Sequence, residues 1–119
     1  MKNLFKVAVL MMPFGVSQAN IDSVPITQLE ERQGVVYELY DDQPFTGRAV
    51  SRFFDGTIRS EVYFKDGLKN GVEKTWFQNG ALRKSFEYRE GERHGEWTSW
   101  DENQRVLFHR NYDKGIRSF

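Results

Sequence analysis

The chain has 119 residues, with 17 Lys and Arg against 17 Asp and Glu, and it contains 10 Phe, 5 Tyr, 3 Trp and no Cys. This length suits one small domain, and the lack of cysteine excludes disulfides, thiolate zinc sites and a cysteine nucleophile. The zero net charge argues against a nucleic-acid partner, because neutralising phosphates needs a basic surplus.

The first nineteen residues have the pattern of a secretory signal peptide. Lys2 and Lys6 are followed by an apolar run at residues 7–12. Small residues at Ser17 and Ala19 predict cleavage after Ala19. The apolar run is shorter than the roughly 20 residues of a membrane-spanning helix. We therefore expect a periplasmic or secreted protein, with a buried N-terminal strand or helix as the alternative.

Residues 20–34 are expected to form a lead-in segment before a repeat domain at residues 35–119. No segment shows a sustained apolar period of 3.6 residues, so the sequence predicts no long amphipathic helix. A helical turn is allowed only at residues 26–33, with the sequence ITQLEERQ. The first strand is predicted at residues 35–40.

Residues of the same type recur every 24 positions from there on. The glycines form three series: Gly47, Gly71 and Gly95; Gly67, Gly91 and Gly115; and Gly56 with Gly80. Aromatic residues keep the spacing at Tyr40, Phe64, Tyr88 and Tyr112, and hydroxyl residues keep it at Ser51, Thr75 and Ser99. Such a period indicates an array of repeated supersecondary units.

Each unit is predicted to be a β-hairpin. In the first unit, Asp55-Gly56 separates strands at residues 47–54 and 59–65, and Asp66-Gly67 follows the second strand. Asp-Gly is a strong hairpin signal, because glycine supplies the positive φ of tight turns. All eight glycines of the three series are therefore expected to be structural turn residues. The predicted fold is all-β: an elongated, single-layer antiparallel meander of hairpin repeats.

Strand alternation predicts which side chains form the core. Residues two apart share one face of a strand, and the second strand of each unit has one mostly apolar face. Its members are Ile58, Val62, Phe64, Leu82, Phe86, Tyr88, Val106, Phe108 and Tyr112. Trp97 and Trp100 have opposite parity, so only one can point inward from a regular strand, and the other is expected to be exposed or to lie near a bulge. We call residues that are 24 positions apart a column. Trp97 is expected to be the exposed one, because the other members of its column are Ala49 and Glu73.

The segment from Gly71 to Gly91 reads G-x-x-x-x-W-F-x-N-G-x-L-x-x-x-x-x-Y-x-x-G. It resembles the bacterial variant of the MORN repeat, the form found in proteins named as YwqK-family antitoxins. The resemblance covers about residues 35–119, and it implies an elongated, twisted sheet that serves as an interaction surface, with no catalytic residue. The third copy departs from the pattern, with Asp101 and Gln104 in place of Phe and Gly, so its turn is expected to be looser.

No residue pattern points to catalysis, a cofactor or a metal. HExxH, GxSxG and phosphate-loop motifs are missing from the sequence. His94 occupies the turn column of Asn70, and His109 occupies a strand column, so both are interpreted as structural. The Ser51, Thr75 and Ser99 column is interpreted as small packing residues rather than nucleophiles. We therefore expect a protein that is not an enzyme.

The candidate partner-binding surface consists of Trp76, Trp97, Trp100 and Tyr63. Tryptophan and tyrosine are enriched in binding hot spots, although the same rings could instead complete a thin core. The leading hypothesis is an exported, noncatalytic module for protein–protein interaction, with an antitoxin or immunity role implied by the resemblance. The alternatives are recognition of membrane lipid or envelope glycan, and an envelope assembly subunit that pairs through the edge of its last strand, near residues 116–119.

Overall fold

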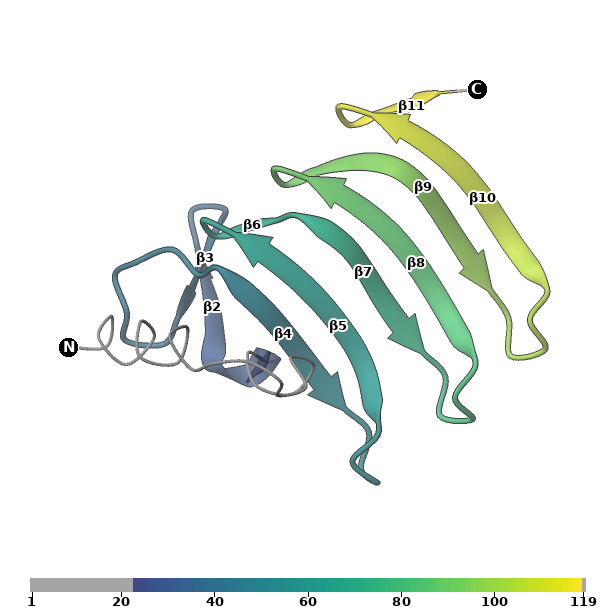
Figure 1. The fold of residues 1–119 in the computed structure, drawn as a ribbon, viewed down its shortest axis with the longest axis horizontal. Coiled ribbons are helices and arrows are strands. Elements are labelled where there is room, and N and C mark those ends of the chain that lie inside the picture. Colours follow the sequence, from purple (N-terminus) through teal and green to yellow (C-terminus); the bar gives the residue numbers. More distant parts are fainter. Residues whose placement is uncertain (1–22, 119) are drawn as a thin grey trace, which may run out of the picture.

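The computed structural model describes residues 23–118 (Figure 1). The predicted signal peptide, residues 1–19, lies outside this range. The elements are β1 (Ser23–Pro25), the 3-10 helix η2 (Ile26–Gln28), β2 (Leu29–Arg32), β3 (Val35–Glu38), β4 (Gly47–Arg52), β5 (Ile58–Lys65), β6 (Leu68–Lys69), β7 (Gly71–Trp76), β8 (Leu82–Arg89), β9 (Glu92–Trp100), β10 (Val106–Asp113) and β11 (Ile116–Ser118). The all-β prediction is confirmed. No helix among these elements is long and apolar enough to cross a membrane.

Nine strands form one open sheet. Its order is β1-β4-β5-β7-β8-β9-β10-β11, with β6 paired to β5. Neighbours from β4 onward are antiparallel, whereas β1 pairs with β4 in parallel. The expectation of a purely antiparallel sheet is therefore wrong. Parallel neighbours need a long crossover connection, and residues 26–46 supply it.

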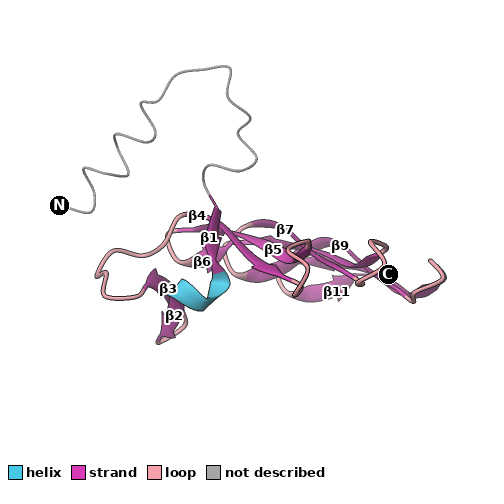
Figure 2. Ribbon diagram, turned by 90° about the horizontal axis from the view of Figure 1, so that it is seen from below, coloured by secondary structure: helices cyan, strands magenta, loops and turns pink. Residues whose placement is uncertain are grey.

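The crossover contains a second, two-stranded sheet made of β2 and β3. It lies on one side of the main sheet, near its N-terminal end (Figure 2), so the expectation of a single layer is also wrong. The helical turn expected at residues 26–33 is limited to Ile26–Gln28, since Leu29–Arg32 is a strand. Two backbone hydrogen bonds attach this hairpin to the rest of the chain: Val36 N donates to Gly67 O, and Phe45 N donates to Val36 O.

The register of the main sheet follows the 24-residue spacing of the sequence. In the hairpins β4–β5, β7–β8 and β9–β10, the equivalent partners are Ser51 and Ser60, Thr75 and Lys84, and Ser99 and Phe108. Each pair is the previous one with 24 added to both numbers. The pairing shifts at the same point of every hairpin, next to these partners, so equivalent side chains reach the same face and level.

The third hairpin turn is closed like the first two. Each of those has two backbone hydrogen bonds of 2.8–2.9 Å, and the third has the same two, from Asp101 N to Arg105 O at 2.9 Å and from Gln104 N to Asp101 O at 3.0 Å. Gln104 adopts the positive φ, 66°, that glycine has in the earlier copies. The Asp101 carboxylate accepts hydrogen bonds from the backbone of Asn103 and Arg105. The expected loosening is wrong, because these bonds hold the turn without glycine.

The buried core lies between the β2–β3 hairpin and the first repeat unit. Phe45, Ala49, Val62 and Phe64 are buried there, with Val24, Leu29 and Val36 packed against them. Of the predicted core face, Val62, Phe64 and Tyr112 are buried, whereas Val106 is 59 % exposed. The remaining members, Ile58, Leu82, Phe86, Tyr88 and Phe108, are half-buried. The described residues place a second layer over the first unit alone, so the later units are covered less.

Gly67 is the turn residue on which the β2–β3 hairpin rests. All eight repeat glycines have positive φ, but they differ in the space around them. A Cβ at Gly67 would lie 2.3 Å from Val35 Cγ1 and 2.9 Å from Val36 O, whereas one at Gly56 would meet nothing within 4 Å. A methyl group at Gly67 would therefore push the hairpin off the sheet.

Alanine substitutions at these two glycines test this packing. We expect Gly56→Ala to lower the free energy of unfolding by about 1–2 kcal/mol, the cost of a left-handed backbone. Gly67→Ala should lower it by a further ~1–3 kcal/mol, because overpacking adds to the strain. Urea denaturation measures both values. Equal losses in the two variants would show that the hairpin does not pack closely on this turn.

Candidate functional site

Beyond the β2–β3 hairpin, the same side of the main sheet carries a surface of aromatic rings. Cross-strand partners lie on one face of a sheet, and Phe86 is paired with Trp97, Tyr88 with Arg93, and Tyr112 with Gly95. We call this surface the aromatic face. Its rings, contributed by β8, β9 and β10, are Phe86, Tyr88, Trp97, Phe108 and Tyr112.

Trp97 lies at the centre of the aromatic face. Its ring stacks on Phe86 with centroids 4.1 Å apart and planes within 7°, and it lies 5.1 Å from both Tyr88 and Tyr112. The indole Nε1 donates a 2.7 Å hydrogen bond to the backbone oxygen of Glu87. These contacts leave Trp97 half-buried, rather than exposed as its sequence column suggested. Each ring pair contributes about 0.5–1.5 kcal/mol beyond area burial.

Cationic side chains lie over these rings. Lys84 Nζ is 5.5 Å from the Phe86 centroid, and the Arg110 guanidinium is 4.6 Å from that of Phe108. The Arg93 guanidinium is 5.4 Å from both Trp97 and Tyr112. Within residues 23–118, none of these three cations forms an ion pair. Their charges are therefore available to a ligand.

Lys69 and Glu73 form the ion pair of this face, with Nζ 2.7 Å from Oε1. Lys69 Nζ also lies 4.7 Å from the Tyr88 ring. Burial alone would lower the pKa of Lys69, but the hydrogen bond and charge of Glu73 outweigh it, so the pKa is raised above 10.5. Burial raises the pKa of Tyr88 above 10.0, against the opposing charge of Lys69. By strand alternation, Glu73 is the acidic side chain that β7–β10 contribute to this side.

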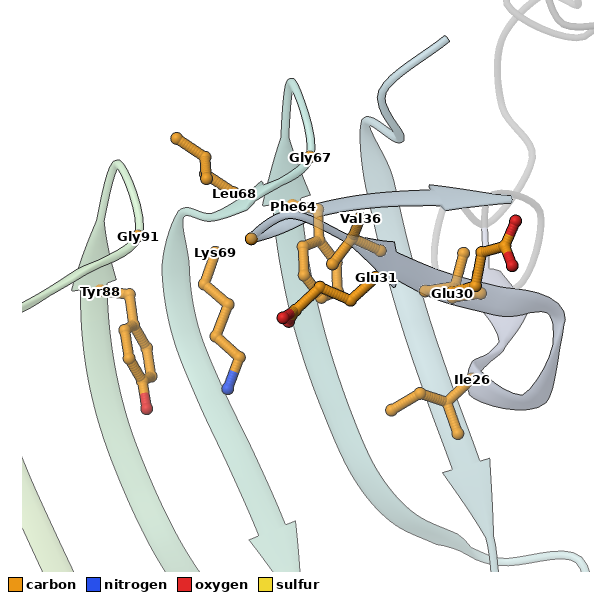
Figure 3. Close-up of a pocket in the computed structure, with 12 residues that line it drawn as sticks. Ile26, Glu30, Glu31, Val36, Phe64, Gly67, Leu68, Lys69, Tyr88 and Gly91 are labelled. Atoms are coloured by element: carbon orange, nitrogen blue, oxygen red, sulfur yellow. The ribbon is translucent and has the colours of Figure 1, made fainter. Parts of the chain in front are cut away.

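A pocket of about 430 Å³ lies between the β2–β3 hairpin and the main sheet (Figure 3). Leu29, Val36 and Leu68 contribute apolar walls, while Glu31 and Lys69 face the space from different walls. Tyr88 also lines the pocket, and it contacts Trp97. The pocket is therefore adjacent to the aromatic face, since the two share Tyr88.

The structure does not bring the four predicted surface residues together. Trp97 lies on the aromatic face, while strand alternation places Trp76, Trp100 and Tyr63 on the opposite side. Tyr63 is 41 % exposed there. Trp100 lines a shallow hollow of about 450 Å³ near the tip of the third hairpin, with Phe77 and Leu107.

Sequence reasoning missed the cations of the aromatic face. Lys84, Arg93 and Arg110 belong to different sequence columns, so the 24-residue period does not group them. Cross-strand pairing does, because Arg110 is the partner of Trp97 and Arg93 the partner of Tyr88. A register extrapolated from the first hairpin predicts the pairing of Arg110 with Trp97.

Comparison with known proteins finds no match for this chain among family models, curated proteins or solved structures. Among residues 23–118, no three His, Asp or Glu side chains converge in an arrangement that could hold a metal ion. The function must therefore be argued from the surface itself.

Replacing single tryptophans with phenylalanine tests the role of the Trp97 hydrogen bond. Trp97→Phe keeps an aromatic ring but removes the bond to Glu87, so we expect a loss of about 1 kcal/mol in unfolding free energy. Trp100, which is also half-buried but has no indole hydrogen bond, is the matched control, and Trp100→Phe should cost less than about 0.5 kcal/mol. Urea denaturation followed by circular dichroism distinguishes the two. An equal cost at both positions would contradict this role.

The Lys69–Glu73 pair predicts a loss of stability in alkaline solution. The folded-state pKa values of Lys69 and Tyr88 lie above the unfolded values of 10.5 and 10.0, so their stabilisation is complete at lower pH and is lost as pH rises through the folded values. In Glu73→Gln, burial of Lys69 is no longer opposed, and the alkaline loss should be smaller. Urea denaturation at several pH values measures the slope. An identical slope in both proteins would contradict the assignment.

Proposed function

We propose that the chain is an exported, noncatalytic binding module whose aromatic face engages a protein partner. The observation that carries this proposal is the stack of Trp97 on Phe86, surrounded by Lys84, Arg93 and Arg110 without ion pairs. Tryptophan, tyrosine and arginine are the residues that dominate binding hot spots. Phe86, Tyr88, Trp97 and Phe108 are half-buried, and the second layer of the described residues does not extend over them, so these rings provide the apolar area such an interface needs.

The repeat identity is part of this proposal. A meander of MORN-like hairpins is supported by the sheet register, which advances by 24 residues from hairpin to hairpin, and by the resemblance of the segment from Gly71 to Gly91. The signal-peptide pattern supports export to the periplasm or the medium. An exported chain cannot meet a cytosolic toxin, so an immunity-like role would be directed at a toxin that acts in the envelope.

A second candidate function is assembly through the edge of the sheet. The last strand of the main sheet, β11, pairs with β10 on one side, and its Ile116 is 73 % exposed. An unpaired edge can add a strand from another chain. Light scattering at high concentration tests this candidate, since a monomer would count against self-assembly.

Affinity capture from an envelope extract tests the leading proposal. The immobilised protein should retain a stoichiometric partner protein, and Arg110→Glu should retain about fivefold less, because it reverses a charge on the aromatic face. Lys74→Glu is the matched control, since strand alternation places Lys74 on the opposite side. Both variants must keep the melting temperature of the parent protein.

Capture of nothing above background from several growth conditions would overturn the proposal. Equal retention by the parent and the Arg110→Glu variant would show that binding uses another surface. Loss of retention by Lys74→Glu alone would assign the interface to the side that carries Trp76, Trp100 and Tyr63.

A further inference from the structure

We infer that the aromatic face binds an extended acidic peptide segment, which inserts an apolar side chain into the pocket beneath the β2–β3 hairpin. This inference rests on the proposed function and names the chemistry of the partner. It follows from three features of the described residues: a local excess of positive charge, cations held over aromatic rings, and an adjacent pocket with apolar walls that shares Tyr88 with the aromatic face.

The charge of this face differs from that of the whole chain, whose net charge is zero. Glu73, the acid on this side of β7–β10, is already paired with Lys69 at 2.7 Å. Lys84, Arg93 and Arg110 therefore remain unbalanced. A ligand that complements this surface carries negative charge, and complementary charge across an interface governs which partner binds.

The two arginines suit carboxylates in particular. Arg93 lies 5.4 Å from both the Trp97 and the Tyr112 ring centroids, and Arg110 lies over Phe108 at 4.6 Å. Contact with a ring restricts the guanidinium while leaving the N–H groups at its edge free to donate. A planar guanidinium donates two parallel hydrogen bonds to a carboxylate. Ordering of the side chain before binding lowers the entropy cost of forming those bonds.

The pocket supplies an apolar anchor site beside these cations. Its volume of about 430 Å³ and its walls of Leu29, Val36 and Leu68 suit an aliphatic or aromatic side chain. Glu30 and Glu31 also line the pocket, and the charge of Lys69 there is already paired with Glu73, so a carboxylate inside the pocket would be repelled. Tyr88 lines the pocket and is the cross-strand partner of Arg93. A chain anchored in the pocket therefore reaches Arg93 next and then Arg110, the partner of Trp97.

A single peptide chain fits this arrangement better than a membrane does. Glu30 and Glu31 lie on the hairpin that stands on the same side of the sheet as the aromatic face, and both are exposed. A planar anionic membrane would meet these acids together with the cations, whereas one extended chain passes beside the hairpin. Anionic membranes also attract clusters of roughly four to eight basic residues, more than the three unpaired cations found here.

Peptide titrations test the inference on the purified protein. The probe is a blocked peptide of about ten residues, in which glutamates flank a central Leu-Phe pair. Its matched controls carry glutamine in place of glutamate, or Gly-Ser in place of Leu-Phe. Isothermal titration calorimetry should show about tenfold tighter binding of the probe than of either control, and weaker binding as salt rises.

Protein variants locate the contact. Arg93→Gln should weaken binding of the acidic probe about fivefold, with little effect on the glutamine control. Lys74→Gln, on the opposite side of the sheet, should leave binding unchanged. Unchanged melting temperatures exclude unfolding as the cause. Equal binding of the glutamate and glutamine peptides, or no effect of Arg93→Gln, would overturn the inference.

Two further probes distinguish other sources of negative charge. Vesicles containing phosphatidylglycerol, and heparin as a polyanionic glycan, are titrated in the same way. Binding of either that depends on Arg93, without binding of the acidic peptide, would overturn the peptide inference. If the acidic peptide fails while capture of a partner still depends on Arg110, then the ligand chemistry is wrong and the proposed function stands.

Discussion

A constant cross-strand register is the constraint on which the rest of the structure depends. Side chains alternate between the faces of a strand, so a slip of one residue would exchange the two faces. The three hairpins keep one register, with Ser51, Thr75 and Ser99 each opposite the residue nine positions later. Equivalent residues consequently form rows that run across the strands, as Phe64, Tyr88 and Tyr112 do. The aromatic face combines this row with rings from neighbouring rows, such as Trp97.

Coverage of those rows changes along the sheet. In the first unit, the β2–β3 hairpin covers Val62 and Phe64 and produces the buried core. In the later units the position of Val62 holds Phe86 and Arg110, and the position of Phe64 holds Tyr88 and Tyr112. The three rings among these residues pack on Trp97 instead. Large aromatic groups bury area against one another. In the uncovered units, contacts between neighbouring rings therefore supply part of the apolar burial that the second layer supplies in the first unit.

Local signals in the sequence predicted part of this fold. Glycine positions with positive φ and the hairpin boundaries follow from the chemistry of individual turns, and the 24-residue period connects one unit to the next. The hairpin β2–β3 is itself local, since Gln33 and Gly34 form its turn with positive φ. The parallel pairing of β1 and the packing of this hairpin on the main sheet could not be predicted in this way, because they depend on contacts between segments far apart in the chain. Val36, for example, is held by Gly67, and no local pattern encodes that bond.

The candidate site was predicted less completely than the fold. Trp97 was selected from its residue type, but its column, Ala49 and Glu73, pointed to exposure. Its actual surroundings come from neighbouring strands, where Phe86 and Arg110 are its partners. A column compares residues at equivalent positions of successive units. A surface, in contrast, is formed by residues that are neighbours on adjacent strands. The charge of the aromatic face was hidden for the same reason, since the chain is neutral as a whole.

The length of these rows is set by the number of repeats. Each repeat adds two strands, and neighbouring strands are about 4.8 Å apart, so one repeat extends a row by roughly 10 Å. A ligand that lies along a row crosses the strands instead of joining their edge. Gain or loss of one 24-residue unit in evolution would lengthen or shorten the aromatic face by a fixed step.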